Sequence, residues 1–80
     1  MNAAEYKRAF DVAKSDVDLS HVDDTILDGY GLPGFGPVVA TVEQVAKTMR
    51  WQARYLNGGW DGEQLTEIRE FFRKRVTVVG

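Results

Sequence analysis

One short segment of the chain carries two aromatic side chains and three cations, the residue types best suited to binding chemistry. Trp51 and Tyr55 stand four residues apart, so a helix would place them on one face. With about 100° of rotation per residue, Lys47, Arg50 and Arg54 lie beside that face of the helix. Trp, Tyr and Arg supply much of the binding energy at protein interfaces. These five residues are therefore the candidate partner-binding surface.

Two interpretations of this aromatic stripe stay open. Large aromatic side chains are mostly buried in folded proteins, so another segment, for which residues 28–37 are the candidate, would cover Trp51. Alternatively, the stripe faces a protein partner or a second copy of this chain. A homodimer through the exposed edge of a strand at residues 76–79 is a variant of the second interpretation.

Metal and catalytic chemistry are not expected. His21 is the single histidine, and one imidazole beside the carboxylates of Asp23 and Asp24 has no recognisable ligand spacing. The chain has no cysteine, so thiolate ligands, thiol nucleophiles and disulfides are excluded. The acids of residues 61–70 stand at helix caps or at helical spacing, where solvation explains them. We therefore expect no enzyme, no metal and no cofactor.

Residues 29–34 read GYGLPG and match the letters of the glycine-rich dinucleotide motif. That motif needs a helix to begin directly after it, so that the N-terminus of the helix meets the pyrophosphate. Pro33 and Pro37 prevent a helix from starting there. The segment is therefore expected to be a structured loop rather than a nucleotide site.

Weak nucleic-acid binding is the alternative function. Two helices joined by residues 57–60 resemble a helix-turn-helix in outline, and the cations available are Lys47, Arg50, Arg54, Arg73 and Arg75. The second helix begins with acids, which repel phosphates where a recognition helix needs donors. The sequence therefore favours a protein partner over nucleic acid.

Length and charge set further limits. Eighty residues make one domain, and no apolar run or signal-like N-terminus points to a membrane or to export. The net charge is −2 at pH 7: residues 1–36 contain three Lys/Arg and seven Asp/Glu, and residues 37–80 contain seven and five. This balance argues against a strong phosphate binder. We expect a cytoplasmic protein, in agreement with the lack of cysteine.

The elements that position the candidate surface are readable from periodicity and caps. Apolar residues recur at helical spacing in residues 42–57, and Thr41 with Gln44 forms a capping box at the start. Asn2 with Glu5 does the same for a helix over residues 2–15, and a third helix is expected over 62–74. Residues 38–40 and 76–79 predict two paired strands.

The expected fold is α+β, with three helices packed with a short two-stranded β-sheet. Its predicted core consists of Tyr6, Phe10, Leu27, Leu32, Phe35, Val39, Val42, Val45, Ala46, Met49, Ala53, Leu56, Leu65, Ile68, Phe72 and Val78.

Three strings between residues 27 and 61 carry a resemblance: LDGYGLPGF, RWQ within the predicted helix, and LNGGWD after it. In them the chain resembles short uncharacterised proteins of bacteria and their prophages. The resemblance covers under half of the chain and implies no activity or site residue. It implies a mobile-element setting, in which a non-enzymatic protein-interaction or regulatory accessory module is the leading function.

Overall fold

The computed structural model describes residues 1–23, 38–55, 60, 62, 70 and 72–79. Helix α1 spans Ala3–Lys14, strand β1 spans Val38–Ala40, helix α3 spans Val42–Tyr55 and strand β2 spans Val76–Val78. Residues 70 and 72–75 are also helical and lead directly into β2. The predicted α+β class, with helices packed against a two-stranded sheet, is confirmed.

Both helix starts follow the local chemistry of the sequence. The Asn2 side chain accepts the Glu5 N–H at 2.8 Å, and the Glu5 carboxylate accepts the Asn2 N–H at 2.8 Å. At α3, the Thr41 hydroxyl accepts the Gln44 N–H at 3.1 Å, and Gln44 Oε1 accepts the Thr41 N–H at 2.8 Å. Each capping box therefore satisfies two backbone donors that a helix leaves without partners.

The predicted end of α1 at residue 15 differs by one residue from that observed. Helix α1 stops at Lys14, and Ser15 caps it, with its hydroxyl donating to the Val12 carbonyl at 2.6 Å. Helix α3 is described as far as Tyr55. The predicted caps at residues 57–59 and at Asp61 with Gln64 lie outside the described residues.

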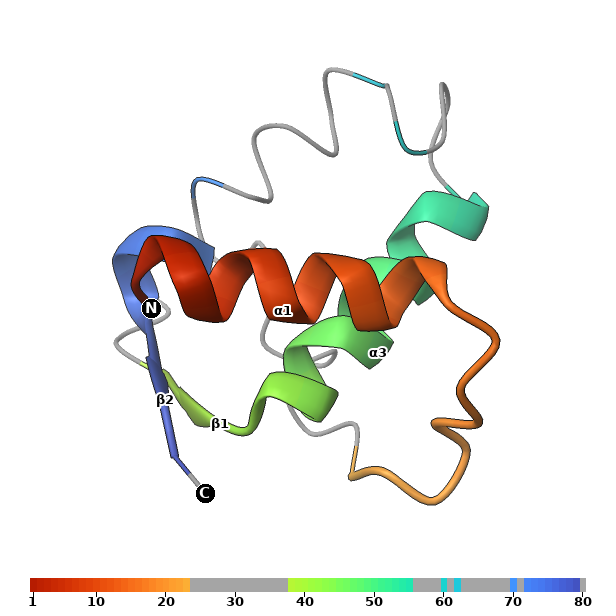
Figure 1. Ribbon diagram of the computed structural model, residues 1–80, viewed down its shortest axis with the longest axis horizontal. Coiled ribbons are helices and arrows are strands. Elements are labelled where there is room, and N and C mark those ends of the chain that lie inside the picture. The colour runs from red at the N-terminus through yellow and green to blue at the C-terminus, as the bar shows by residue number, and fades with distance from the viewer. Residues whose placement is uncertain (24–37, 56–59, 61, 63–69, 71, 80) are drawn as a thin grey trace.

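The two strands pair in parallel, with Val38 opposite Val76 and Ala40 opposite Val78. The Val79 N–H extends this ladder to the Ala40 carbonyl at 3.0 Å. A parallel pair needs a long crossover, which α3 and the helical residues before β2 supply. Figure 1 shows the sheet at the end of the molecule where the N-terminus lies, with the loop of residues 15–23 at the opposite end.

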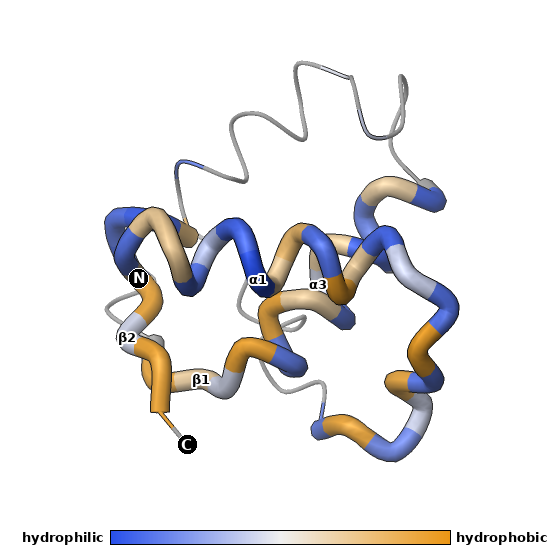
Figure 2. The backbone as a smooth tube through the Cα atoms, viewed as in Figure 1, coloured by the Kyte–Doolittle hydropathy of each residue, from blue (hydrophilic) through white to orange (hydrophobic). Residues whose placement is uncertain are grey.

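Val39 corrects the predicted core, because its side chain is 66% exposed. Successive residues of a strand point to opposite faces, so burying Ala40, at 1% exposure, turns Val39 outward. Strand β2 alternates in the same way, since Val76 is buried and Thr77 is exposed. Figure 2 shows apolar residues in the two strands.

The core sits where α1 crosses α3 (Figure 1). Small side chains, Ala9 and Ala13 of α1 and Ala46 of α3, are fully buried at this crossing and allow the two helices to approach closely. Of the predicted core, Val42, Val45, Ala46, Met49 and Phe72 are buried, and Tyr6, Phe10, Ala53 and Val78 are half-buried. Leu27, Leu32, Phe35, Leu56, Leu65 and Ile68 lie outside the described residues.

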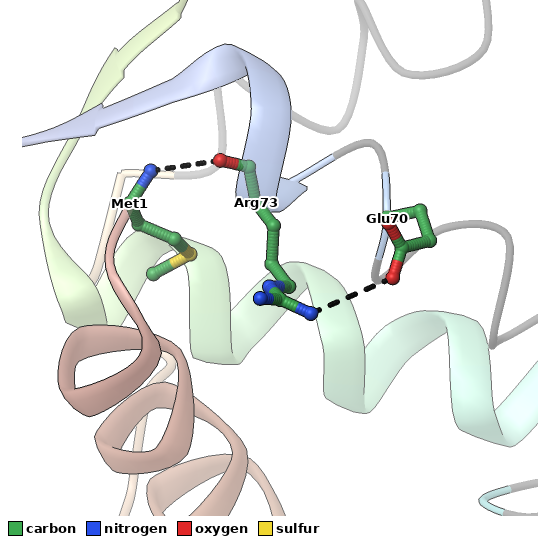
Figure 3. A network of polar contacts seen from close by, with 3 residues as sticks. All are labelled: Met1, Glu70 and Arg73. Atoms are coloured by element: carbon green, nitrogen blue, oxygen red, sulfur yellow. Dashed lines mark hydrogen bonds and ion pairs between the residues drawn. The ribbon is translucent and has the colours of Figure 1, made fainter.

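The amino terminus is tied to the end of the chain. The Met1 ammonium donates to the Arg73 carbonyl at 3.2 Å and to the Val76 carbonyl. The Arg73 guanidinium in turn meets the Glu70 carboxylate at 3.6 Å (Figure 3). That last ion pair is half-exposed, so it contributes little. The backbone contacts hold the start of α1 beside β2.

None of the helices within the described residues is long and apolar enough to cross a bilayer.

Candidate functional site

Helix α3 divides sharply between a buried arc and an exposed arc. Met49 is fully buried, whereas Trp51, rotated from it by about 200°, is 48% exposed. The Trp51 side chain is therefore not covered as a core residue would be. Thr48, three residues before Trp51 on the same helix, is fully buried.

The buried arc of α3 is wider than its apolar period predicts. Thr48 and Gln52, which lie one turn apart on the same side of the helix, widen this arc, and both are at most 1% exposed. The Thr48 hydroxyl donates to the Gln44 carbonyl one turn earlier at 3.0 Å, so the helix itself satisfies it. Gln52 is different, because neither its Oε1 nor its Nε2 meets a hydrogen-bond partner among the described residues. The buried arc of α3 therefore includes two polar side chains as well as its apolar stripe, whereas Trp51 lies outside it.

Arg50 stands at the border between the two arcs and closes the end of α1. Its Nε donates to the Ala13 carbonyl at 3.0 Å, and one terminal nitrogen donates to the Val12 and Ser15 carbonyls, each at 3.0 Å. The other terminal nitrogen donates to the Val17 carbonyl at 2.7 Å. The last carbonyls of a helix have no N–H donors within the helix, and the Arg50 guanidinium supplies such donors. Arg50 is thus a structural residue that positions the surface.

The loop of residues 15–23 is fastened to α3 by a second cation. Lys47 Nζ donates to the Val22 carbonyl at 2.7 Å. Within the loop, the Val22 N–H donates to the Leu19 carbonyl at 3.0 Å, and the Leu19 side chain is only 3% exposed. A buried apolar anchor and two basic side chains therefore hold a loop that has little regular structure of its own.

Asp18 turns this loop by accepting the Ser20 N–H at 2.9 Å. Hydrogen bonds from the Ser20 backbone and hydroxyl, followed by the nearby charges of His21 and Arg50, lower the pKa of Asp18 below its usual value of 3.8. Hydrogen bonds to an ionised carboxylate favour the charged form, which explains the direction. Asp18 therefore presents a negative charge beside the basic residues of α3.

Two hollows border Arg50 and Arg54, which line both of them. The first has a volume of about 320 Å³ and the second about 290 Å³. The first is lined by Ala13, Lys14, Ser15, Arg50, Ala53, Arg54 and Trp60. The second is lined by Asp18, Leu19, Ser20, Lys47, Arg50, Trp51 and Arg54.

Four of the five predicted surface residues meet at the second hollow: Lys47, Arg50, Trp51 and Arg54. Tyr55 belongs to α3, but its side chain lies outside the described residues. Lys14, Leu19 and Trp60 also line the hollows, and the sequence did not predict them as surface residues. The i, i+4 spacing of Phe10 and Lys14 was a usable signal, since Lys14 Nζ lies 5.1 Å from the centre of the Phe10 ring.

Trp60 makes an aromatic contact with α1. Its ring meets Phe10 edge-on at 5.4 Å between centroids, and Phe10 stacks on Tyr6 at 6.2 Å. Edge-to-face pairs add to the stabilisation that burial provides. This row places Trp60 at the border of the first hollow, beside the end of α1.

The cations proposed for nucleic-acid binding do not form one patch. Arg50 contacts the carboxyl end of α1, whereas the Arg73 carbonyl contacts Met1 before the start of that helix. Eleven residue steps of α-helix, about 16 Å, separate the ends of α1. Arg75 follows Arg73 and leads into β2, so it belongs to the far end of the molecule.

No group of three or more His, Cys, Asp or Glu side chains in the described part of the chain is placed to hold a metal ion. His21 and Asp23 are both exposed on the loop. In comparisons with known proteins, no family model, curated protein or solved structure matches this chain.

Proposed function

We propose that the chain is a non-enzymatic protein-interaction module whose contact surface is the second hollow, with Trp51 at its centre. The observation that supports this most directly is the exposure of Trp51, 48%, on a helix whose opposite arc is fully buried. An indole fixed on a rigid helix contacts a partner with little loss of conformational entropy, and Trp is the residue most enriched at binding hot spots.

The neighbouring side chains take distinct roles in this proposal. Lys47 and Arg54 form a basic border around Trp51, and Arg50 keeps the loop of residues 15–23 against α3. Tyr55 is proposed to extend the same surface by one helical turn. A regulatory accessory protein of a phage or prophage is the setting that the sequence resemblance suggests for such a module.

Weak nucleic-acid binding remains the second candidate, with Lys47, Arg50, Arg54, Arg73 and Arg75 as contacts. The separation of Arg73 and Arg75 from the cations of α3 disfavours it, because a duplex contact needs several cations along one face. The carbonyl contacts of Arg50 disfavour it further, because they use donors that would otherwise reach a phosphate.

An affinity capture at moderate and high salt, with purified candidate partners and with bacterial lysate, tests the proposal. Wild-type chain is compared with Trp51→Ala and with Val39→Ala, which removes another exposed apolar side chain at the sheet end of the molecule. A protein held by the wild type and by Val39→Ala at both salts, and lost with folded Trp51→Ala, is the expected result. Equal capture by all three chains would contradict the proposal. Nucleic acid held only at the lower salt would support the alternative.

A further inference from the structure

The two hollows adjoin on α3, because Arg50 and Arg54 line both of them. Together they are called the α3 groove below, and one end of it is bordered by Trp60 and Lys14. The other end is bordered by Trp51 and Lys47. An extended peptide advances about 3.3 Å per residue, so a groove of this size takes a short segment of chain.

The charge of the α3 groove is opposite to that of the whole protein. Its lining contains four cations, Lys14, Lys47, Arg50 and Arg54, and one carboxylate, Asp18. The whole chain carries a net charge of −2 at pH 7. A concentrated basic lining in an acidic protein attracts an acidic ligand, and complementary charge sets both partner choice and the association rate.

The four cations differ in how far their side chains are already engaged, and the Lys14 ammonium itself lies over the Phe10 ring at 5.1 Å. Arg50 is occupied by carbonyls of α1 and the following loop, and Lys47 contacts Val22. Lys14 and Arg54 stand in the last turns of their helices and are exposed. The helix dipole favours cations at these positions, but their side chains also border the groove, where a carboxylate would meet both.

We propose that the α3 groove binds a short acidic peptide segment of another protein. Its carboxylates would pair with Lys14 and Arg54, and an apolar side chain would pack on Trp51. This inference rests on the proposed function and names the chemistry of the partner.

A peptide fits better than a nucleic acid for a reason of charge spacing. The loop beside the groove exposes Asp16, Asp18 and Asp23, which repel the unbroken charge of a phosphate backbone. A peptide places apolar or neutral residues between its carboxylates and avoids that repulsion. Arg73 and Arg75, which would lengthen the basic surface for a polyanion, stand at the other end of α1.

Fluorescence anisotropy with the full chain tests the inference. The probe is a fluorescein-labelled peptide in which glutamate and leucine alternate, and its control has glutamine in place of glutamate. Each peptide is titrated with wild type, Arg54→Glu, Lys14→Glu and Arg75→Glu. Arg75→Glu is the matched control, because it makes the same charge reversal at an exposed site far from the groove. Circular dichroism confirms that each variant is folded.

The expected result is that the glutamate peptide binds the wild type at least about tenfold more tightly than the glutamine peptide does. Arg54→Glu and Lys14→Glu should each weaken binding by about tenfold or more, and Arg75→Glu by about twofold or less. Equal losses in all three variants would overturn the inference, since they would report net charge alone. Tighter binding of a thymidine oligonucleotide, or self-association abolished by Arg54→Glu, would also overturn it.

The same variants separate this inference from the proposed function. If the acidic peptide does not bind but capture of a protein still depends on Trp51, the module stands and the partner is not acidic. If capture is independent of Trp51, the contact surface itself is wrong.

Discussion

Replacing Arg50 with alanine should destabilise the fold far more than its place on a candidate surface would suggest. Its guanidinium holds the Val12, Ala13, Ser15 and Val17 carbonyls at 2.7 to 3.0 Å. The bonds to Val12 and Ala13 are part-buried, and those to Ser15 and Val17 are exposed. Water replaces the two exposed hydrogen bonds at small cost, so the two part-buried hydrogen bonds decide how much stability is lost.

A hydrogen bond to a charged group contributes about 1.5–3 kcal/mol, and bonds made by one side chain are not additive. We therefore expect Arg50→Ala to lower the free energy of unfolding by about 3 kcal/mol. A domain of this length has a stability of about 4–12 kcal/mol, so the loss is a large fraction of it. The corresponding fall in Tm is about 15 °C. Arg50→Lys should recover only part of the loss, because an ammonium lacks the planar fork.

Urea unfolding followed by far-UV circular dichroism measures this difference. Arg54→Ala is the matched control, since Arg54 lies one turn further along α3 and is exposed. It should change the free energy of unfolding by no more than about 0.5 kcal/mol. If Arg50→Ala and Arg54→Ala lower the free energy of unfolding by the same small amount, the hydrogen bonds from Arg50 to α1 add no net stability. The structural role assigned to Arg50 is then wrong.

Two further predictions concern single polar side chains. Gln52→Met should raise the free energy of unfolding by about 1 kcal/mol, because the buried amide meets no partner among the described residues and methionine has a similar shape. Gln44→Met on the same helix should lower the free energy of unfolding by a similar amount, because the Gln44 amide caps α3. Urea unfolding measures both changes. A loss of stability with Gln52→Met would show that the Gln52 amide is satisfied in the folded protein. Because the folded-state pKa of Asp18 is lowered, its contribution to stability is present above the ordinary value of 3.8 and is lost as pH falls through the lower folded value. An NMR titration should therefore give a lower midpoint for Asp18 in the folded chain than in the same chain unfolded in urea, and equal midpoints would refute the folded-state Ser20 contacts as its cause.

The helix starts and the pairing of strands were accessible from the sequence because they depend on short-range patterns. Asn2 with Glu5, and Thr41 with Gln44, act across three residues, and a capping box works by the same geometry wherever it occurs. The apolar period of α3 located Val42, Val45 and Met49 in the core. The β-branched residues of 76–79 and the apolar run of 38–40 predicted both strands, which are in fact paired, although β2 itself ends at Val78.

Which face of each element is covered depended on contacts that the local pattern does not contain. Val39 was assigned to the core by hydrophobicity, but Ala40 is the residue of β1 that faces the core, and the alternation of a strand then turns Val39 outward. Gln52 and Leu19 are buried because of what packs against them, although one is polar and the other stands in an acidic loop. The interpretation of Trp51 as covered or exposed was open for the same reason.

The candidate surface shows most clearly what the sequence determines and what only the tertiary structure decides. Sequence alone placed Lys47, Arg50, Trp51 and Arg54 on one side of a helix, because a period of 3.6 residues fixes which side chains are neighbours. Only the tertiary structure gave Arg50 its carbonyl partners, 33 to 38 residues away, and so made it a support for the surface. Only the tertiary structure brought Lys14 and Trp60 to the same groove. The physical reason is that helix geometry is set by neighbours in the chain, whereas burial and charge pairing are set by segments that meet only when the chain is folded.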